Sequence, residues 1–294
     1  MNRLLGIGLI AVSAASFGTL AIIGRYAYAD GMDVTTLLFL RFSISALFMI
    51  AWLAQRKESI PGGHTMLQLA GMGGLGYVGQ SFCYMSAIQY ASAGLVALLL
   101  YLYPTFVILL SVIFLKARLT PSRIAALALA TIGAALTANP QGGQLQGILL
   151  AILAAAIYAV YIIVGTGVMK KVTAMQSSTV IFASAGMVFG VLTILKGPHW
   201  PATTAGWLAV VAIAVLATIV PVVTFLAGLK IIGPTDASLL SVLEPVVTVG
   251  LAALLFGEII KPAMLLGGGL ILAAVLLLTI GQGEPAAMPE MPGG

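Results

Sequence analysis

Charged residues lie far apart in this chain, and the stretches between them are almost wholly apolar. From Leu4 to Gly24 no charge occurs, which is about the 20 residues that a helix needs to cross a bilayer core of ~30 Å. Two uncharged stretches, 59–115 and 124–169, are long enough for two spans each, and turn-forming segments at 89–94 and 139–144 divide them. Together with the remaining stretches, the pattern predicts an all-α integral membrane protein with ten transmembrane helices.

The two halves of the chain align without a gap at a constant offset of 141 positions. Among the matches, Gly6, Gly24, Pro104 and Pro121 fall on Gly147, Gly165, Pro245 and Pro262. Five spans per half is an odd number, so the second half enters the membrane from the opposite side, which makes an inverted repeat. We expect five-helix repeats over 1–139 and 147–281, followed by a disordered tail over 282–294, which is rich in Pro and Gly.

Only 7% of the residues are charged, where a soluble domain carries about 25%, and the charges that remain indicate an orientation. Lys and Arg in short loops collect on the cytoplasmic side. With the N-terminus inside, nine such residues lie in inner loops, and three, Arg25, Lys196 and Lys261, lie in outer loops. We therefore expect a multi-pass protein of the plasma membrane, the inner membrane in bacteria, with both termini cytoplasmic. The net charge of +5 reflects topology, so no nucleic-acid partner is expected.

A cleaved signal peptide is the alternative for the first apolar stretch, because Arg3 precedes a short apolar segment that ends in small residues. This stretch has a partner at the start of the second repeat, near Gly147, which favours a transmembrane helix.

The stretch LSVLEPVVTV at 240–249 places a charge and a proline inside a predicted span. A charged side chain at the bilayer centre costs ~2.5–3.5 kcal/mol on insertion scales, so it usually faces a cavity or a partner. Pro245 lacks a backbone donor, which frees the carbonyl of Ser241, and Pro104 has the same effect in the first repeat. Two kinked helices related by pseudo-symmetry favour a midplane cavity between them. The alternative is a packing kink in which Glu244 is a neutral, hydrogen-bonded strut.

Aromatic and polar side chains near mid-span are the expected walls of that cavity. Tyrosine combines an apolar ring with one hydroxyl, which suits a zwitterion or an aromatic side chain; the alternative for each tyrosine is a core position. Tyr101 is only two residues from Tyr103, so on one helix they cannot share a face, and Tyr103 is the better candidate. The expected substrate-binding residues are Tyr77, Gln80, Tyr84, Tyr103, Tyr158, Tyr161, Ser241 and Glu244.

Three prolines and two charged residues are candidates for helix kinks and for a gate. The expected kinks are at Pro104, Pro221 and Pro245. Arg41 lies near the outer end of the second predicted span, from which its long side chain can snorkel to the membrane surface. The functional alternative is a gate in which Arg41 pairs with Glu258, or with a substrate carboxylate, when the cavity opens.

The second repeat closes with LEPVVTVGLAALLFGEIIKPAMLLGGGLILAAVLLL, and the chain resembles the EamA domains of the drug/metabolite transporter superfamily over nearly its whole length. The motifs that carry the resemblance are Glu244-Pro245, Gly257-Glu258, the glycines at 267–269 and LLFLRFSISALFMI around Arg41. The first repeat departs from the pattern, with Tyr103 in place of Glu244 and Lys116-Ala117 in place of Gly257-Glu258. We therefore expect the two halves to contribute unequally to a substrate site.

This resemblance implies a secondary transporter that exports small metabolites, with amino acids as the expected class, by alternating access around a midplane cavity. In length and helix count the chain is similar to the YddG-type amino-acid exporters. The implied partners are a small-molecule substrate and the lipid bilayer, and the protein is expected to be a monomer or a homodimer.

Two other classes of function remain as alternatives. A passive channel is the first, since alternating access cannot be derived from residue patterns alone. A membrane-embedded enzyme is the second, but it would need a nucleophile with its base, paired carboxylates or a metal cluster. The lone Cys83 and two distant histidines, His64 and His199, form no such pattern. No G-x-x-x-x-G-K-[ST] motif is present, so energy must come from gradients. No catalytic residue, metal or cofactor is expected.

The predicted orientation can be tested by cysteine labelling. In a Cys83→Ser background, a thiol reagent that cannot cross the membrane should reach Lys57→Cys only from the cytoplasm, because residue 57 lies in a predicted inner loop. Lys196→Cys in a predicted outer loop is the matched control and should react only from the periplasm. Labelling of residue 57 from the periplasm alone would contradict the predicted topology.

Overall fold

A computed structural model describes residues 2–115, 120–137, 145–169 and 171–280. Within these ranges the chain forms helices and no strands, which confirms the all-α prediction for them. The predicted tail over 282–294 lies outside the described residues.

The helices of the first half are α1 (Asn2–Gly18), α2 (Leu20–Ala29), α3 (Val34–Arg56), α4 (Gly63–Gly71), the π-helix η1 (Met72–Tyr77), α5 (Val78–Tyr90), α6 (Ala93–Leu100), α7 (Tyr103–Leu115) and α8 (Pro121–Thr137).

The second half follows the same order with fewer interruptions. Its helices are α9 (Leu145–Met169), α10 (Ala174–Lys196), α11 (Thr204–Ala214), the π-helix η2 (Val215–Ile219), α12 (Val220–Ser241), α13 (Leu243–Phe256) and α14 (Pro262–Ile280). The first repeat begins with two helices, α1 and α2, where the second begins with the single helix α9.

Six segments of the described chain are long and apolar enough to cross a membrane. They are Arg3–Ala29, Val34–Arg56, Ala93–Phe114, Leu145–Gly165, Ala174–Lys196 and Thr204–Leu229, and three shorter apolar helices cover Pro121–Leu136, Leu243–Phe256 and Pro262–Leu278. The chain is therefore organised as a multi-pass membrane protein. These nine segments and the run α4-η1-α5 correspond in order to the ten predicted spans, whose number stays a prediction.

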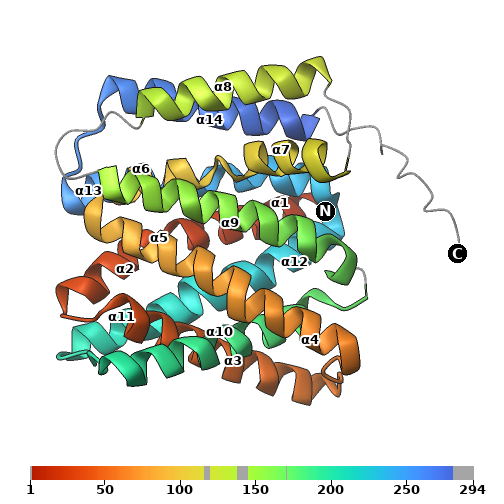
Figure 1. Ribbon diagram of the computed structural model, residues 1–294, viewed down its shortest axis with the longest axis vertical. Coiled ribbons are helices and arrows are strands. Elements are labelled where there is room, and N and C mark those ends of the chain that lie inside the picture. Colours follow the sequence, from red (N-terminus) through yellow and green to blue (C-terminus); the bar gives the residue numbers. More distant parts are fainter. Residues whose placement is uncertain (1, 116–119, 138–144, 170, 281–294) are drawn as a thin grey trace, which may run out of the picture.

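The helices run roughly parallel across the bundle, from side to side in Figure 1. At the left-hand side α2 and α13 end while α3, α6 and α11 begin; we call this side the Glu258 end, because Glu258 follows α13. At the opposite side α3 and α7 end and α4 begins, and we call it the Arg56 end. The first residues of α1 and the last residues of α14 both lie at the Arg56 end.

The two repeats interlock, because the first helix of each packs against the other repeat. Helix α1 packs against α12 and α13, and α9 packs in the matching way against α5, α6 and α7. Helices at equivalent positions also pair directly, α3 with α10 and α8 with α14. Small residues allow these close approaches: a Cβ atom added at Gly147 of α9 would lie 2.6 Å from the Cβ of Ala91. Any cavity in the centre of this bundle is therefore shared by both halves.

Each repeat contains a helix break before its matching proline. Tyr101 and Leu102 separate α6 from α7, and Val242 separates α12 from α13. Pro104 and Pro245 then lie in the first turn of the new helix, where the missing N–H would have no intrahelical partner. At these two positions the expected kinks thus take the form of breaks between helices.

The π-helices η1 and η2 overlap when one repeat is shifted onto the other, and the sequence pattern gave no indication of either. Pro221, the third expected kink, is the second residue of α12, the helix that directly follows η2. π-Helices are rare and are frequent at functional sites, and both of these lead into the central cavity.

Candidate functional site

A cavity of about 720 Å³ lies between the two repeats, within the range of ~300–1,000 Å³ that is usual for small-molecule sites. Seven of the eight expected binding residues line it: Tyr77, Gln80, Tyr84, Tyr103, Tyr158, Ser241 and Glu244. The eighth, Tyr161, lies outside the lining, with its ring centroid 5.8 Å from that of Tyr77 and 6.0 Å from that of Tyr158. The structure thus brings these residues together, and their role in binding stays a prediction.

Other lining residues were not among the expected binding residues. They are chiefly apolar or carry a hydroxyl, and they include Ser13, Phe17, Ser81, Tyr101, Val107, Ser178, Phe225 and Leu278. Phe17 and Tyr158 occupy equivalent positions in the two repeats, so both faces of the pseudo-symmetric bundle contribute an aromatic ring. Among the described residues, no group of three or more His, Cys, Asp and Glu side chains could hold a metal ion.

The hydroxyl of Tyr101 lies 2.7 Å from the carbonyl oxygen of Ser241 and 3.1 Å from Oε2 of Glu244. Pro245 removes the helical donor that the Ser241 carbonyl would otherwise use, so the tyrosine replaces a lost backbone bond. A phenol has a single proton, which is shared between the two acceptors. This contact joins the break in the second repeat to the break in the first.

Helical spacing predicts Tyr103 and not Tyr101 at the cavity, but the structure places both there. The two cannot share a face of one continuous helix, but α6 ends at Leu100 and α7 begins at Tyr103. The helical spacing rule does not hold across that break, and the ring centroids lie 6.1 Å apart. Of the two, Tyr101 is the one that bonds to Glu244.

Aromatic rings form a continuous series from Tyr101 to Phe42. Neighbouring ring centroids in this series lie 4.8–6.1 Å apart, in the order Tyr101, Tyr103, Tyr158, Tyr161, Tyr77 and Phe42. Aromatic pairs at such distances stabilise one another beyond the area that they bury. One end of the series is hydrogen-bonded to Glu244, and at the other end the guanidinium carbon of Arg41 lies 4.8 Å from the Phe42 ring centroid.

Arg41 points into the protein and does not snorkel to the membrane surface. Only 3% of the residue is exposed, and it lines the cavity. Its Nε donates to Oγ1 of Thr218 at 2.8 Å, and the Thr218 hydroxyl in turn donates to the carbonyl of Ile213 at 2.8 Å. That second bond spans five residues at the π-helix η2, so the π-helix fixes the side chain that holds Arg41.

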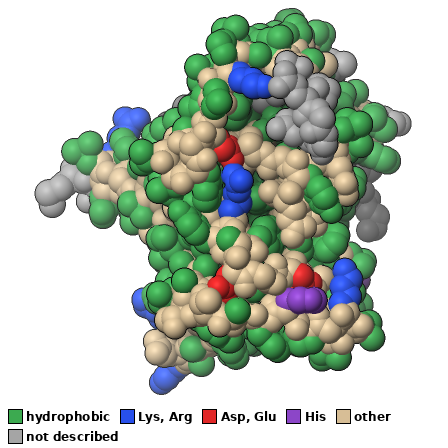
Figure 2. Space-filling view, turned by 90° about the vertical axis from the view of Figure 1, so that its left-hand side faces the viewer, with side chains coloured by type: hydrophobic (Ala, Val, Ile, Leu, Met, Phe, Trp, Pro, Cys, Tyr) green, Lys and Arg blue, Asp and Glu red, His purple; other side chains and the backbone are tan. Residues whose placement is uncertain are grey.

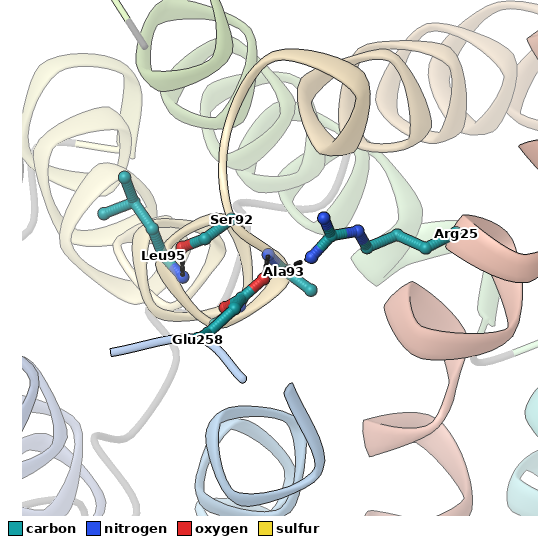
Figure 3. A network of polar contacts seen from close by, with 6 residues as sticks. Arg25, Ser92, Ala93, Leu95 and Glu258 are labelled. Atoms are coloured by element: carbon teal, nitrogen blue, oxygen red, sulfur yellow. Dashed lines mark hydrogen bonds and ion pairs between the residues drawn. The ribbon is translucent and has the colours of Figure 1, made fainter. Parts of the chain in front are cut away.

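The expected contact between Arg41 and Glu258 is not formed in this structure. Glu258 instead makes an ion pair with Arg25, and Figure 3 shows that Arg25 reaches it from α2. The same carboxylate accepts hydrogen bonds from the backbone N–H groups of Ala93 at 3.1 Å and Gly94 at 3.5 Å. A carboxylate at a helix N-terminus is stabilised by unpaired N–H groups and by the helix dipole. Glu258 therefore fastens α2, the start of α6 and the loop after α13 to one another.

A second contact fastens the loops at the Glu258 end. The Asp30 carboxylate accepts from the Thr203 hydroxyl at 2.5 Å and from the backbone N–H of Ala202 at 2.8 Å. The hydrogen bond from the Thr203 side chain is the main cause that lowers the pKa of Asp30, so the group is ionised at neutral pH. Figure 2 looks onto this end, where acidic and basic side chains lie next to each other among apolar side chains.

Comparison with known proteins identifies relatives over almost the whole chain. The model of the EamA-like transporter family matches residues 4–139 and 145–280. An uncharacterized transporter of Archaeoglobus fulgidus is 29% identical over 272 residues, which is 92% of this chain and 95% of that protein. The uncharacterized inner membrane transporter YedA of Escherichia coli K12 is 28% identical over 251 residues, 82% of this chain and 80% of its own.

A solved crystal structure shares the fold. It aligns with 95% of this chain and 96% of its own, with a TM-score of 0.66 and 24% sequence identity. The arrangement of interlocked helices described above therefore also occurs in an experimental structure.

The bond from Tyr101 to Ser241 predicts a difference between two neighbouring tyrosines. Tyr101→Phe leaves the Ser241 carbonyl and one Glu244 oxygen without this donor, which should destabilise the protein by about 1–3 kcal/mol. Tyr103→Phe is the control, because the described residues provide no hydrogen-bond partner for its hydroxyl. Thermal unfolding in the same detergent should show a clear fall in midpoint for Tyr101→Phe alone. Equal midpoints for the two variants would contradict this account of the break.

Proposed function

Because the chain belongs to the EamA-like transporter family, we propose that it is a secondary transporter that exports amino acids by alternating access around the central cavity. The proposed location is the plasma membrane, with ten spans and both termini cytoplasmic. The Escherichia coli relative, an inner membrane transporter, supports the inner membrane as its location in bacteria. The similarity in length and helix count favours the YddG-type exporters as the branch.

The observation that carries this proposal is the cavity carboxylate. Glu244 lines the cavity, and of its two oxygens only Oε2 has a hydrogen-bond partner among the described side chains, the hydroxyl of Tyr101. The other oxygen remains available for a substrate ammonium. The tyrosines beside it offer ring faces to a cation or to an apolar side chain. A small ammonium compound with an apolar body, such as an amino acid, fits this combination.

The proposed orientation makes this arrangement an inward-facing one. The Lys and Arg distribution favours the Arg56 end as cytoplasmic, and the cavity lining extends toward that end, with Ser178 near the start of α10 and Leu278 near the end of α14. At the other end, the contacts of Glu258 and Asp30 hold the loops together. We infer that the cavity is reached from the cytoplasm and is closed on the outer side.

The closing contact at Glu258 is weak enough to be reversible. The side chains of Arg25 and Glu258 are 35% and 15% exposed, so water partly screens the pair, which lies between fully exposed pairs, worth about 0.2–1 kcal/mol, and fully buried ones. A carrier needs two states that differ by no more than a few kcal/mol, so that both are populated. We call the contact between Arg25 and Glu258 the Glu258 clamp. Because it is not a fully buried ion pair, it suits a gate that must open in every cycle.

In the sequence, the positions equivalent by the repeat do not provide the same ion pair. The positions equivalent to Glu258 and Arg25 are Ala117 and Thr166, which cannot form an ion pair. The two ends should therefore differ in the energy needed to open them. This difference is a structural basis for a transport cycle that favours one direction.

The role of Glu244 is tested by removing its charge while its shape is kept. Glu244→Gln should lower the flux of labelled L-phenylalanine per folded molecule in proteoliposomes by at least about tenfold, because an amide cannot pair with an ammonium. Glu58→Gln, an exposed carboxylate at the Arg56 end, is the matched control and should transport normally. Flux should be followed between about pH 5 and 8, a window that lies above the ordinary carboxyl pKa of ~4.3.

The wild-type protein in the same vesicles separates a carrier from a channel. A carrier shows saturating flux, and preloaded unlabelled substrate accelerates uptake by counterflow. Normal flux with an unchanged pH profile in Glu244→Gln would mean that Glu244 is a structural strut. Flux that never saturates and shows no counterflow would favour the passive channel.

A further inference from the structure

Arg41 is a buried cation that faces the cavity without a counter-ion. It is 3% exposed and lies among the lining residues. Among the described residues it has no ion-pair partner, and neither has Glu244, although both line the same cavity. A buried charge without a partner is unfavourable, so a cavity without solute leaves both charges without a counter-ion.

The terminal nitrogens of Arg41 are the part of the side chain left for a ligand. A guanidinium has five N–H donors, and in the described residues only Nε–H is used, by the hydroxyl of Thr218. The fully enclosed side-chain atoms without a hydrogen-bond partner are Gln68 Oε1 and Thr193 Oγ1. Neither terminal nitrogen of Arg41 belongs to that group, so both retain access to the open volume of the cavity.

Contacts on the other sides of the guanidinium fix its direction. The Thr218 hydroxyl gives its own proton to the carbonyl of Ile213, so toward Arg41 it acts only as an acceptor. The Phe42 ring lies 4.8 Å from the guanidinium carbon. An arginine held at Nε presents its remaining N–H groups as a planar fork, the geometry that matches the two oxygens of a carboxylate.

The cavity also contains a second charged group, Glu244, at a distance from Arg41. Tyr77 and Tyr84 both lie within electrostatic reach of Arg41 and of Glu244. The series of rings from Phe42 to Tyr101 connects the same two charged groups along the wall. The cavity therefore has a positive and a negative group with an aromatic surface that extends from one to the other.

We propose that Arg41 binds a carboxylate of the transported solute, so that the protein selects solutes that carry an anionic group on an apolar or aromatic body. This inference rests on the proposed function, in which Glu244 takes an ammonium group, and adds a separate subsite for a carboxylate. Thr218 is a positioning residue for Arg41, since it holds Nε and does not itself need to touch the solute. A purely structural Arg41 would instead serve to anchor η2 to α3 and would affect all solutes alike.

Three probes that share a phenyl ring separate the two charges. L-phenylalanine has both groups, 3-phenylpropionate has only the carboxylate, and phenethylamine has only the ammonium. Dissociation constants are measured by calorimetry on the purified full-length protein, for wild type, Arg41→Gln and Glu244→Gln. Arg41→Gln should weaken 3-phenylpropionate by at least about tenfold more than phenethylamine, and Glu244→Gln should show the opposite preference.

A milder variant covers the case in which Arg41→Gln does not fold. Arg41→Lys keeps the charge but loses the planar fork, so it should fold and should still weaken 3-phenylpropionate more than phenethylamine. Thr218→Val should weaken the same probe by a smaller factor, since the guanidinium remains but is no longer held at Nε.

The outcomes also separate this inference from the proposed function. Equal weakening of all three probes in the Arg41 variants, or a wild-type protein that binds neither carboxylate probe, overturns the assignment of Arg41. A wild-type protein that transports no amino acid, yet binds 3-phenylpropionate through Arg41, contradicts the amino-acid assignment and leaves Arg41 as a carboxylate site. Selective loss of the carboxylate probes together with amino-acid transport supports both.

Discussion

Inside a membrane, a backbone carbonyl that loses its helical partner must find another donor, and at the break before α13 the carbonyl of Ser241 finds the hydroxyl of Tyr101. Two further hydrogen bonds cross between the repeats near helix boundaries. Oγ1 of Thr248 donates to the carbonyl of Gly18 at the end of α1, and Oγ of Ser13 donates to the carbonyl of Pro221. In each case the donor comes from the opposite repeat. These three hydrogen bonds therefore help to hold the two repeats together.

The helix framework follows the pseudo-symmetry of the two repeats, and key charged groups lie at positions where the two repeats differ in sequence. Glu244 stands opposite Tyr103 in the repeat, Glu258 opposite Ala117, and Arg41 opposite Phe182. At each of these pairs one repeat supplies a charge and the other supplies an apolar or aromatic residue. In the proposed transport cycle the frame rocks between two similar packings, and the charged groups make those two packings unequal in energy and in what they bind.

The spans, the family and most of the cavity wall could be predicted because each depends on local residue types. Charge spacing marks the spans, a family model bears out the resemblance that began at Glu244-Pro245, and tyrosines at mid-span depth do lie at the cavity. The role of Tyr101 was missed because helical spacing assumes an unbroken helix. The π-helix that places Thr218, and hence the inward direction of Arg41, leaves no mark in a hydrophobic pattern. Arg25 and Glu258 are 233 residues apart, so only the folded chain brings them together.

In the proposed mechanism, one cavity is exposed to one side of the membrane at a time, and the Glu258 clamp sets the balance between the two states. The most direct measurement is the reactivity of Ser81→Cys, a cavity position, in a Cys83→Ser background, toward an impermeant thiol reagent added from either side. The account predicts reactivity from the Arg56 end, and predicts that Glu258→Gln lowers this reactivity while raising it from the Glu258 end, because one state replaces the other. Reactivity that rises at the Glu258 end without falling at the Arg56 end, as in an open channel, would contradict alternating access.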